Sequence, residues 1–273
     1  MSSICLRLGM SRQNYYAQRR RRQRESVDAD LVEQLVQRER REQPRMGARK
    51  LRHVLGKEMA QAGIKLGRDR FFEVLRQREL LLEPKPAAYP CTTQSRHYLP
   101  VFKNEIKALE LSAANQVWVS DITYLRTAEG FLFLALITDK WSRKVVGHHC
   151  GDSLEAEGCI KALDVALRDL PEHARPIHHS DRGSQYCCHL YVDRLAQRQL
   201  GISMTEKNHC AENAMAERMN GILKQEYGLG AEFPIKAAAL AAVRQGVILY
   251  NTKRPHTALG YRVPHEVHEF GFN

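Results

Sequence analysis

The sequence has little of what marks membrane, secreted or zinc-bound proteins. Its 273 residues contain no run of about 18 uncharged apolar residues, the length that a transmembrane helix needs, and no signal-peptide pattern. The seven cysteines form no Cys-x-x-Cys pair, which favours reduced thiols over disulfides. We therefore expect a soluble cytoplasmic protein without a membrane partner.

Acidic residues are scarce in the first part of the chain. Residues 1–100 carry 22 Lys and Arg against 11 Asp and Glu, a surplus of 11, whereas residues 101–273 carry 20 of each, so all of the net charge of +11 lies in the first part. This split predicts that the N-terminal region attracts phosphates while the remainder does chemistry. The alternative is a solubilising tail.

The distribution of charged, apolar and proline residues divides the chain into three segments. Residues 1–82 form a basic helical DNA-binding region, in which Ser11 caps a charged helix, residues 28–42 form an amphipathic helix, and a helix-turn-helix-like pair follows at 47–55 and 68–80. The candidate DNA contacts on the last of these helices are Arg68, Arg70 and Arg76. Residues 83–112, which begin with a proline-rich stretch, are assigned to a linker, and 113–273 to a catalytic core with a C-terminal helical extension.

The core alternates strands and helices. Three sequential strands with short connections favour an antiparallel meander, and the later strand-helix-strand order favours parallel addition. We expect strands at about 117–125, 131–138, 145–150, 177–180 and 202–205, and helices at 154–170, 184–199, 211–227 and 236–250.

Three carboxylates stand out in this core. Asp121 lies within an apolar run, Asp181 follows a short strand, and Glu217 lies in a helical pattern. Carboxylates in such places are costly to desolvate unless they are paired or bound to cations, and Mg²⁺ takes carboxylate oxygens together with substrate phosphates. Two such ions would clamp the attacking and leaving oxygens of a phosphoryl transfer.

Competing acids are weighed against these three. Lys224 lies seven residues after Glu217 and shares its helix face, which favours Glu217 over Glu212. Glu212 is expected near the helix N-terminus as a cap. Asp139, at the end of the second strand, is interpreted as structural and paired with Lys140, Arg143 or Lys144.

Adjacent histidines and cysteines raise the question of zinc. Neighbouring residues on a strand point to opposite faces, so adjacent ligands do not easily close one tetrahedral site. This argues against zinc at the three clusters, which are His148-His149-Cys150, His178-His179 and Cys187-Cys188-His189.

Four short motifs follow one another along the chain between residues 117 and 264. They are Asp121-Ile122-Thr123-Tyr124, the stretch from His179 to Tyr186, the stretch from Glu212 through Glu217 to Lys224, and the stretch from Tyr250 to Tyr261. Together they resemble the DDE transposases of bacterial insertion sequences, specifically the second-frame protein of the insertion-sequence-three family, which shares its catalytic core with retroviral integrases.

The resemblance implies an α/β fold, namely a ribonuclease H-like, retroviral integrase-type core with a mixed five-stranded sheet, preceded by a small all-α helix-turn-helix region. It implies that Asp121, Asp181 and Glu217 are catalytic and bind two Mg²⁺ or Mn²⁺ ions. The implied activity is cleavage at the ends of the element and strand transfer into target DNA. The candidate phosphate contacts are Lys224, Arg182, Arg254 and His256.

The implied partners are double-stranded DNA, as terminal inverted repeats and as target, and further copies of the chain, at least a dimer on DNA. An upstream-frame protein is a further expected fusion or partner, because no sustained heptad is present here. The implied location is the bacterial cytoplasm, at the nucleoid. Two alternatives stay open: a metal-dependent DNA nuclease of the same fold, and a non-catalytic DNA-binding regulator.

Overall fold

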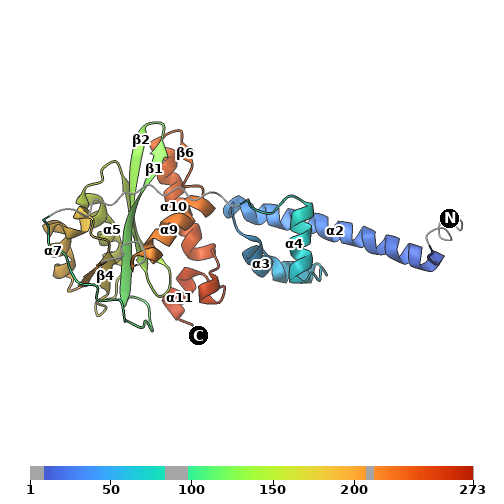
Figure 1. Ribbon diagram of the computed structural model, residues 1–273, viewed down its shortest axis with the longest axis horizontal. Coiled ribbons are helices and arrows are strands. Elements are labelled where there is room, and N and C mark those ends of the chain that lie inside the picture. Colours follow the sequence, from blue (N-terminus) through green and yellow to red (C-terminus); the bar gives the residue numbers. More distant parts are fainter. Residues whose placement is uncertain (1–8, 84–97, 207–211, 273) are drawn as a thin grey trace. The chain divides into compact units, whose positions relative to one another are not determined.

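The computed structural model describes residues 9–83, 98–206 and 212–272. The chain divides into two compact units, Met1–Lys85 and Pro86–Asn273, and each is described by itself (Figure 1). No helix in the described part of the chain combines the length and apolarity needed to cross a bilayer.

The first unit begins with one long helix, α2 (Arg12–Glu42). Its N-cap is Ser11, as predicted, whose Oγ accepts a hydrogen bond from the backbone N–H of Asn14 at 3.1 Å. The expected separate helix at 28–42 is wrong, because α2 runs continuously through that region. No glycine or proline stands between the two predicted segments to end the helix.

Helices α3 (Ala48–Gln61) and α4 (Arg68–Gln77) pack against the second half of α2. Apolar side chains at helical spacing on all three helices form one core. Its fully buried members include Val32, Val36, Leu51, Leu55, Phe71 and Leu75. The short turn between α3 and α4 gives the predicted helix-turn-helix-like pair.

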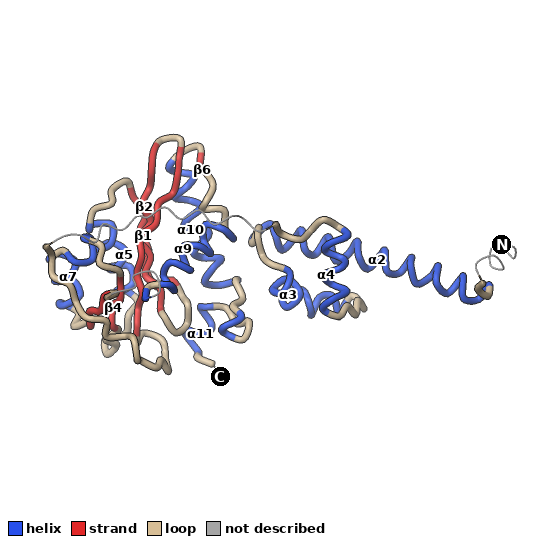
Figure 2. Tube along the Cα trace, in the orientation of Figure 1, coloured by secondary structure: helices blue, strands red, loops and turns tan. Residues whose placement is uncertain are grey.

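The second unit is built on a mixed sheet (Figure 2). Its main strands are β1 (Val117–Thr127), β2 (Gly130–Asp139), β3 (Val145–Gly151), β4 (Ile177–Ser180) and β5 (Gly201–Met204), in the spatial order β3-β2-β1-β4-β5. The first three pair antiparallel, while β4 and β5 add in parallel, which confirms the predicted meander followed by crossovers.

One edge of β1 is only partly covered. Strand β4 pairs with β1 at 117–119, and a short sixth strand that the sequence did not predict, β6 (Glu232–Phe233), pairs with it at 126–127. Among the described strands none pairs with the stretch between these two contacts on that edge. Asp121 lies in this gap, while on the opposite edge it pairs with Leu136 of β2.

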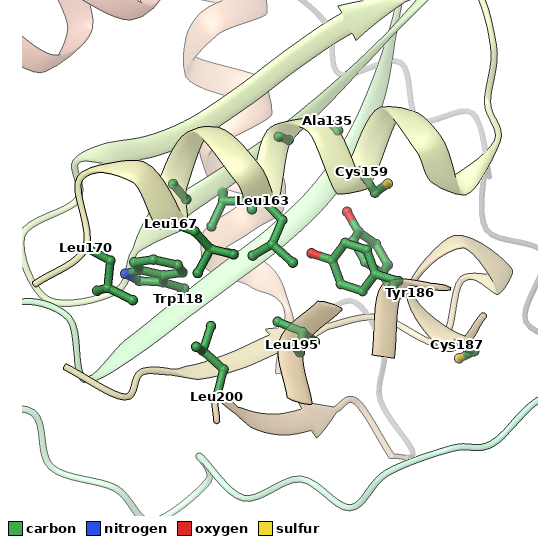
Figure 3. Packing of buried hydrophobic residues seen from close by; sticks show 14 of the residues in the cluster. Trp118, Ala135, Cys159, Leu163, Leu167, Leu170, Tyr186, Cys187, Leu195 and Leu200 are labelled. Carbon is green, nitrogen blue, oxygen red and sulfur yellow. The ribbon is translucent and has the colours of Figure 1, made fainter. Parts of the chain in front are cut away.

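Helices cover both faces of the sheet, so β2 is buried on both sides (Figure 1). One face packs against α5 (Ala156–Arg168) and α7 (His189–Gln197), around the fully buried Trp118 (Figure 3). The other face packs against α9 (Ala214–Glu226) and α10 (Lys236–Lys253).

The predicted helix 184–199 is broken in two. Cys188 has extended dihedral angles and separates α6 (Ser184–Cys187) from α7. In one continuous helix, residues five positions apart would point in different directions. Because of the break, Tyr186 on α6 and Tyr191 on α7 both point into the core. The adjacent rings of these tyrosines meet edge to face, 5.4 Å apart.

The C-terminal extension closes one end of this unit. Pro255 follows the end of α10, and a 3₁₀ turn η1 (Thr257–Leu259) leads to α11 (Pro264–Phe270).

Asp139 is structural, as predicted, and of its predicted cationic partners Arg143 interacts with it electrostatically. Its fully buried carboxylate accepts hydrogen bonds from Ser142 N–H and Oγ, both at 2.7 Å, and from Asn115 N–H at 2.8 Å. Burial alone would raise the pKa of Asp139, yet hydrogen bonds from His268, Ser142 and Asn115 lower it below its ordinary value. The acid therefore ties β2 to α11.

The second unit also includes residues before 113. Residues 84–97 of the predicted linker lie outside the described residues, and the rest of it contacts the core. Ile106 is buried against Val117, Val119 and Ala216. The backbone N–H of Glu105 donates to Ser203 Oγ at 2.9 Å.

Gly147 lets α5 lie directly on β3. A Cβ at this position would fall 2.3 Å from the Ala162 carbonyl oxygen and 2.8 Å from Ala166 Cβ. We expect Gly147→Ala to lower the free energy of unfolding, measured in urea, by about 1–3 kcal/mol because the helix must shift outward. The control is Gly221→Ala on α9, where a Cβ meets nothing within 4 Å and stability should rise by about 0.5–1 kcal/mol. Equal effects of the two changes would contradict this packing account.

Candidate active site

Asp121 and Asp181 line one cleft, beside the gap along β1. The cleft has a volume of about 200 Å³ and its other lining residues are Ile122, Thr123, Tyr124, Phe133, Leu154, Gly183, Gln185 and Tyr186. Asp121 is fixed by the middle of β1, whereas Asp181 lies in the turn after β4. The parallel pairing of β1 with β4 brings the two acids to the same edge of the sheet.

The electrostatics of the cleft centre on Asp121. Its pKa is raised to about 7, first by burial and then by the negative charge of Asp181, with a smaller contribution from Glu217. A hydrogen bond from Asn220 Nδ2 to Asp121 Oδ2, at 2.7 Å, opposes the shift. Asp181 and Glu217 therefore both act electrostatically on Asp121.

Helix α9 carries Glu217 in its first turn and lies against β1. Two buried asparagines fasten it there. Asn213 Nδ2 donates to the Ser120 carbonyl at 3.1 Å, and Asn220 donates to Asp121. These asparagines are two helical turns apart, so their hydrogen bonds fix the rotation of α9 about its own axis. This also fixes the position of the exposed Glu217, which lies between them.

Glu212 serves a different purpose. Its carboxylate accepts hydrogen bonds from Asn104 Nδ2, at 3.1 Å, and from the backbone N–H of Glu206. Glu212 directly precedes Asn213, the N-cap of α9, and its favourable interaction with the helix dipole stays a prediction. Its hydrogen bonds join the segment after β5 to the segment before β1.

Lys224 lies on α9 and reaches the gap in β1. Its Nζ is 4.4 Å from the centre of the Tyr124 ring. Burial lowers the pKa of Lys224, and the charge of Asp121 opposes that shift. The structure thus places a cation between the α9 face and the carboxylate cleft.

Arg182 and Arg254 both form hydrogen bonds to other parts of the second unit. Arg182 Nε donates to the Thr205 carbonyl at 2.6 Å and so joins the turns that follow β4 and β5. Arg254 is only 3% exposed and forms a bidentate pair with Glu226, at 2.6 and 2.7 Å. Its Nη1 lies 2.8 Å from His256 Nε2. Arg254 therefore has a structural role, and the phosphate contacts expected of Arg254 and His256 stay predictions.

The predicted contacts of the first unit lie on the surface of α4. Arg68, Arg70 and Arg76 are well exposed, and each forms a surface ion pair, with Asp69, Glu25 and Glu73 respectively. Exposed pairs of this kind contribute little to stability, so the guanidinium groups exchange partners at low cost.

The buried histidines have protein partners. His178 Nε2 lies 2.6 Å from Ser120 Oγ and 2.8 Å from Tyr191 Oη, and His179 Nδ1 lies 2.8 Å from Ser203 Oγ. Burial lowers the pKa of His178 to about 3 and that of His179 to about 4. Both rings are therefore neutral, and as neighbours on β4 they lie on opposite faces of the sheet.

The donor set suits a hard divalent cation. Carboxylate oxygens are the ligands that Mg²⁺ and Mn²⁺ prefer, and a bound cation would offset both the burial and the repulsion from Asp181 that raise the pKa of Asp121. Within the described residues, no three His, Cys, Asp or Glu side chains converge closely enough to form a ready-made metal cluster. Asp121 and Asp181 share the cleft, and Glu217 approaches from α9.

Comparison with known proteins agrees with this arrangement. Two family models, each described as an integrase core domain, match residues 112–210 and 198–264. A 31 kDa protein of insertion element IS600 from Shigella sonnei is 36% identical over 263 residues, covering 94% of each chain. Transposase InsF of insertion sequence IS3A from Escherichia coli K12 is 37% identical over 172 residues, covering 62% of this chain and 60% of InsF.

The chain belongs to the insertion-sequence-three family of DDE transposases. Its second unit is a ribonuclease H-like integrase core, which is a polynucleotidyl transferase fold, and the chain is a DNA transposase. The resemblance, fold class and enzyme class predicted from the sequence are thereby confirmed.

Solved integrase structures are also similar to this IS3-family chain. The catalytic core of HTLV-2 integrase in complex with magnesium has a TM-score of 0.44 at 15% identity, covering 57% of this chain and 97% of that one. A chain of the simian T-cell lymphotropic virus intasome has a TM-score of 0.49 at 16% identity, covering 82% and 70%.

Sequence reasoning missed the partner of Asn220. The spacing of Glu217, Asn220 and Lys224 at i, i+3 and i+7 placed them on one face, but the partner of the amide lies 99 residues away in the sequence. The aromatic and apolar lining of the cleft was missed as well, because its residues read as ordinary strand positions.

Asn220 provides a direct test of this geometry. Asn220→Ala removes the donor to Asp121 Oδ2 and one of the two bonds that align α9 with β1. We expect the affinity for Mn²⁺ or Mg²⁺, measured by isothermal titration calorimetry, to fall about tenfold or more, as for other residues that orient metal ligands.

The matched control is Asn251→Ala. Asn251 fastens α10 to β3 through two bonds to the backbone of Val145, each 2.9 Å long. Its loss should lower the free energy of unfolding by about 1–2 kcal/mol and leave metal affinity unchanged. Equal loss of metal affinity in both variants would show that Asn220 acts only through stability.

Proposed function

We propose that this transposase cuts the ends of its insertion sequence and joins the resulting 3′ ends to target DNA at the carboxylate cleft. The observation that carries this proposal is the approach of three acids at the gap in β1, where Asp121 and Asp181 line one cleft and Glu217 acts on Asp121 from α9. A phosphodiester that enters the gap meets these acids with Lys224 beside them.

Each residue has a distinct role in this proposal. Asp121, Asp181 and Glu217 would hold two divalent ions, Mg²⁺ or Mn²⁺, which when bound supply charge neutralisation at the attacking and leaving oxygens. Asn220 orients the Asp121 carboxylate. Lys224, whose Nζ lies over the Tyr124 ring, would contact a phosphate of the bound strand.

The first unit supplies general attraction to the DNA backbone. Its exposed arginines Arg68, Arg70 and Arg76 on α4 are candidates for phosphate contact, together with the basic surface of α2. The proposed DNA partners are the terminal inverted repeats of the element and the target duplex. We propose that at least two copies assemble on DNA, because two ends must be processed together.

The proposal also includes a protein partner and a location in the cell. An upstream-frame protein would supply specific recognition of the ends, as a fusion or a partner, since the chain shows no sustained heptad of its own. The proposed location is the bacterial nucleoid.

Glu217 and Glu212 give a matched pair of variants. Glu217→Gln keeps the side-chain volume but removes a charge from the site, so we expect formation of joined product to fall about a hundredfold or more, with DNA binding retained. Product is measured by the appearance of covalently joined strands on a denaturing gel.

Glu212→Gln should keep joining within about threefold and lower the free energy of unfolding by about 1 kcal/mol, because both hydrogen bonds go to one carboxylate oxygen, Oε2, and a neutral amide oxygen accepts them more weakly than the charged one. The opposite pattern, with loss in the Glu212 variant and full joining in the Glu217 variant, would overturn the assignment.

A further inference from the structure

A row of aromatic and cationic side chains leads away from the carboxylate cleft along β1 and β2. Residues directly opposite each other in an antiparallel pair lie on the same face of the sheet. Tyr124 pairs with Phe133, and Arg126 pairs with Phe131. Side chains two positions apart on a strand share a face, so all four lie on one face.

This row begins in the cleft. Tyr124 and Phe133 line it together with Asp121. The rings of Tyr124 and Phe131 meet edge to face, with centres 5.6 Å apart, so the row continues to the β1–β2 hairpin. The aromatic strip is defined here as Tyr124, Arg126, Phe131 and Phe133, together with Lys224 over the Tyr124 ring.

The outer end of the strip is open. Phe131 is 55% exposed at the hairpin end of β2, beyond the part of that strand that pairs with β3. Helix α5 begins only at Ala156, and Leu154, just before it, reaches Phe133 at the cleft. The ring of Phe131 therefore faces solvent at the end of a surface that starts at the carboxylates.

The charges beside the aromatic strip indicate which kind of ligand it binds. Arg126 is exposed, and Lys224 lies 4.4 Å from the centre of the Tyr124 ring. The nearby acid of the hairpin, Glu129, accepts a hydrogen bond from the backbone N–H of Lys236 at 2.6 Å, so its charge is directed towards the start of α10. Aromatic rings bordered by cations are the combination that binds unpaired nucleotides, whose bases stack while their phosphates meet the cations.

We propose that the aromatic strip binds unpaired bases of a DNA end next to Asp121. The bases of an intact duplex are already stacked on one another, so their faces are accessible to these rings only where the end is opened. The proposal deepens the proposed function, because the strip would hold the nucleotides that flank the phosphodiester in the cleft and keep the opened end in place.

The test uses the full chain and reads position, because the basic first unit also binds DNA. The probe is a short oligodeoxythymidine with one 5-iododeoxyuridine, irradiated with the protein in EDTA so that no cleavage occurs. Tryptic peptides that carry the cross-link are identified by mass spectrometry. We expect cross-links in the peptides 108–126 and 127–140, which hold the strip residues of both strands.

Three variants separate stacking from mere apolarity. Phe131→Leu should reduce the yield of cross-links in these two peptides about tenfold, because it keeps an apolar side chain and removes the ring. Phe131→Trp should retain the yield. Phe270→Ala is the matched control, since Phe270 is 72% exposed on α11 and should not affect the cross-links.

The same iodinated strand annealed to oligodeoxyadenosine provides the contrast. Cross-links in the strip peptides should be lost with this duplex. Equal yields from duplex and single strand, equal yields from the Phe131→Leu and Phe270→Ala proteins, or cross-links confined to residues 12–83 would each overturn the proposal. Because the assay contains no metal, these outcomes are independent of whether the protein cuts or joins DNA.

Discussion

The burial of the Asp121 carboxylate in the middle of a strand is the constraint on which the site depends. A carboxylate there loses hydration, and the neighbouring charge of Asp181 adds repulsion, which together raise the pKa of Asp121 to about 7. The fold offsets part of this cost with one hydrogen bond from Asn220. The part of this cost that is not offset makes cation binding at the site favourable, and bound cations support phosphate chemistry.

The sheet supplies the space for that chemistry. Strand β4 leaves β1 after 119 and β6 joins it only at 126, so the stretch that carries Asp121 has an open edge. Helix α9 spans this opening, held to β1 by Asn213 and Asn220, and brings in Glu217. A substrate strand that enters the opening therefore meets carboxylates from three elements and the cation of Lys224. Beyond it, the aromatic strip extends the same surface to the hairpin.

Much of this could be read from the sequence, and the failures have physical causes. Apolar runs and short connections were enough to predict the antiparallel meander and the parallel addition of the later strands, and spacing along α9 placed Glu217 and Lys224 on one face. The role of Arg254 could not be predicted, because it is neutralised by Glu226, 28 positions earlier, and only the fold brings that pair together. The continuity of α2 was missed because local polarity was mistaken for a boundary. The roles of the three acids remain predictions that the geometry supports.

The most direct test of the central claim is whether the carboxylate cleft joins DNA through a 3′-hydroxyl. A pre-cleaved end of the insertion sequence is incubated with plasmid, Mn²⁺ and the full chain, with the upstream-frame protein supplied. Covalently joined product should form, and a dideoxy end should abolish joining while leaving any hydrolytic nicking, because a positioned hydroxyl attacks as readily as water at such a site. Identical nicking of hydroxyl and dideoxy ends with no joined product would contradict the account and favour a nuclease.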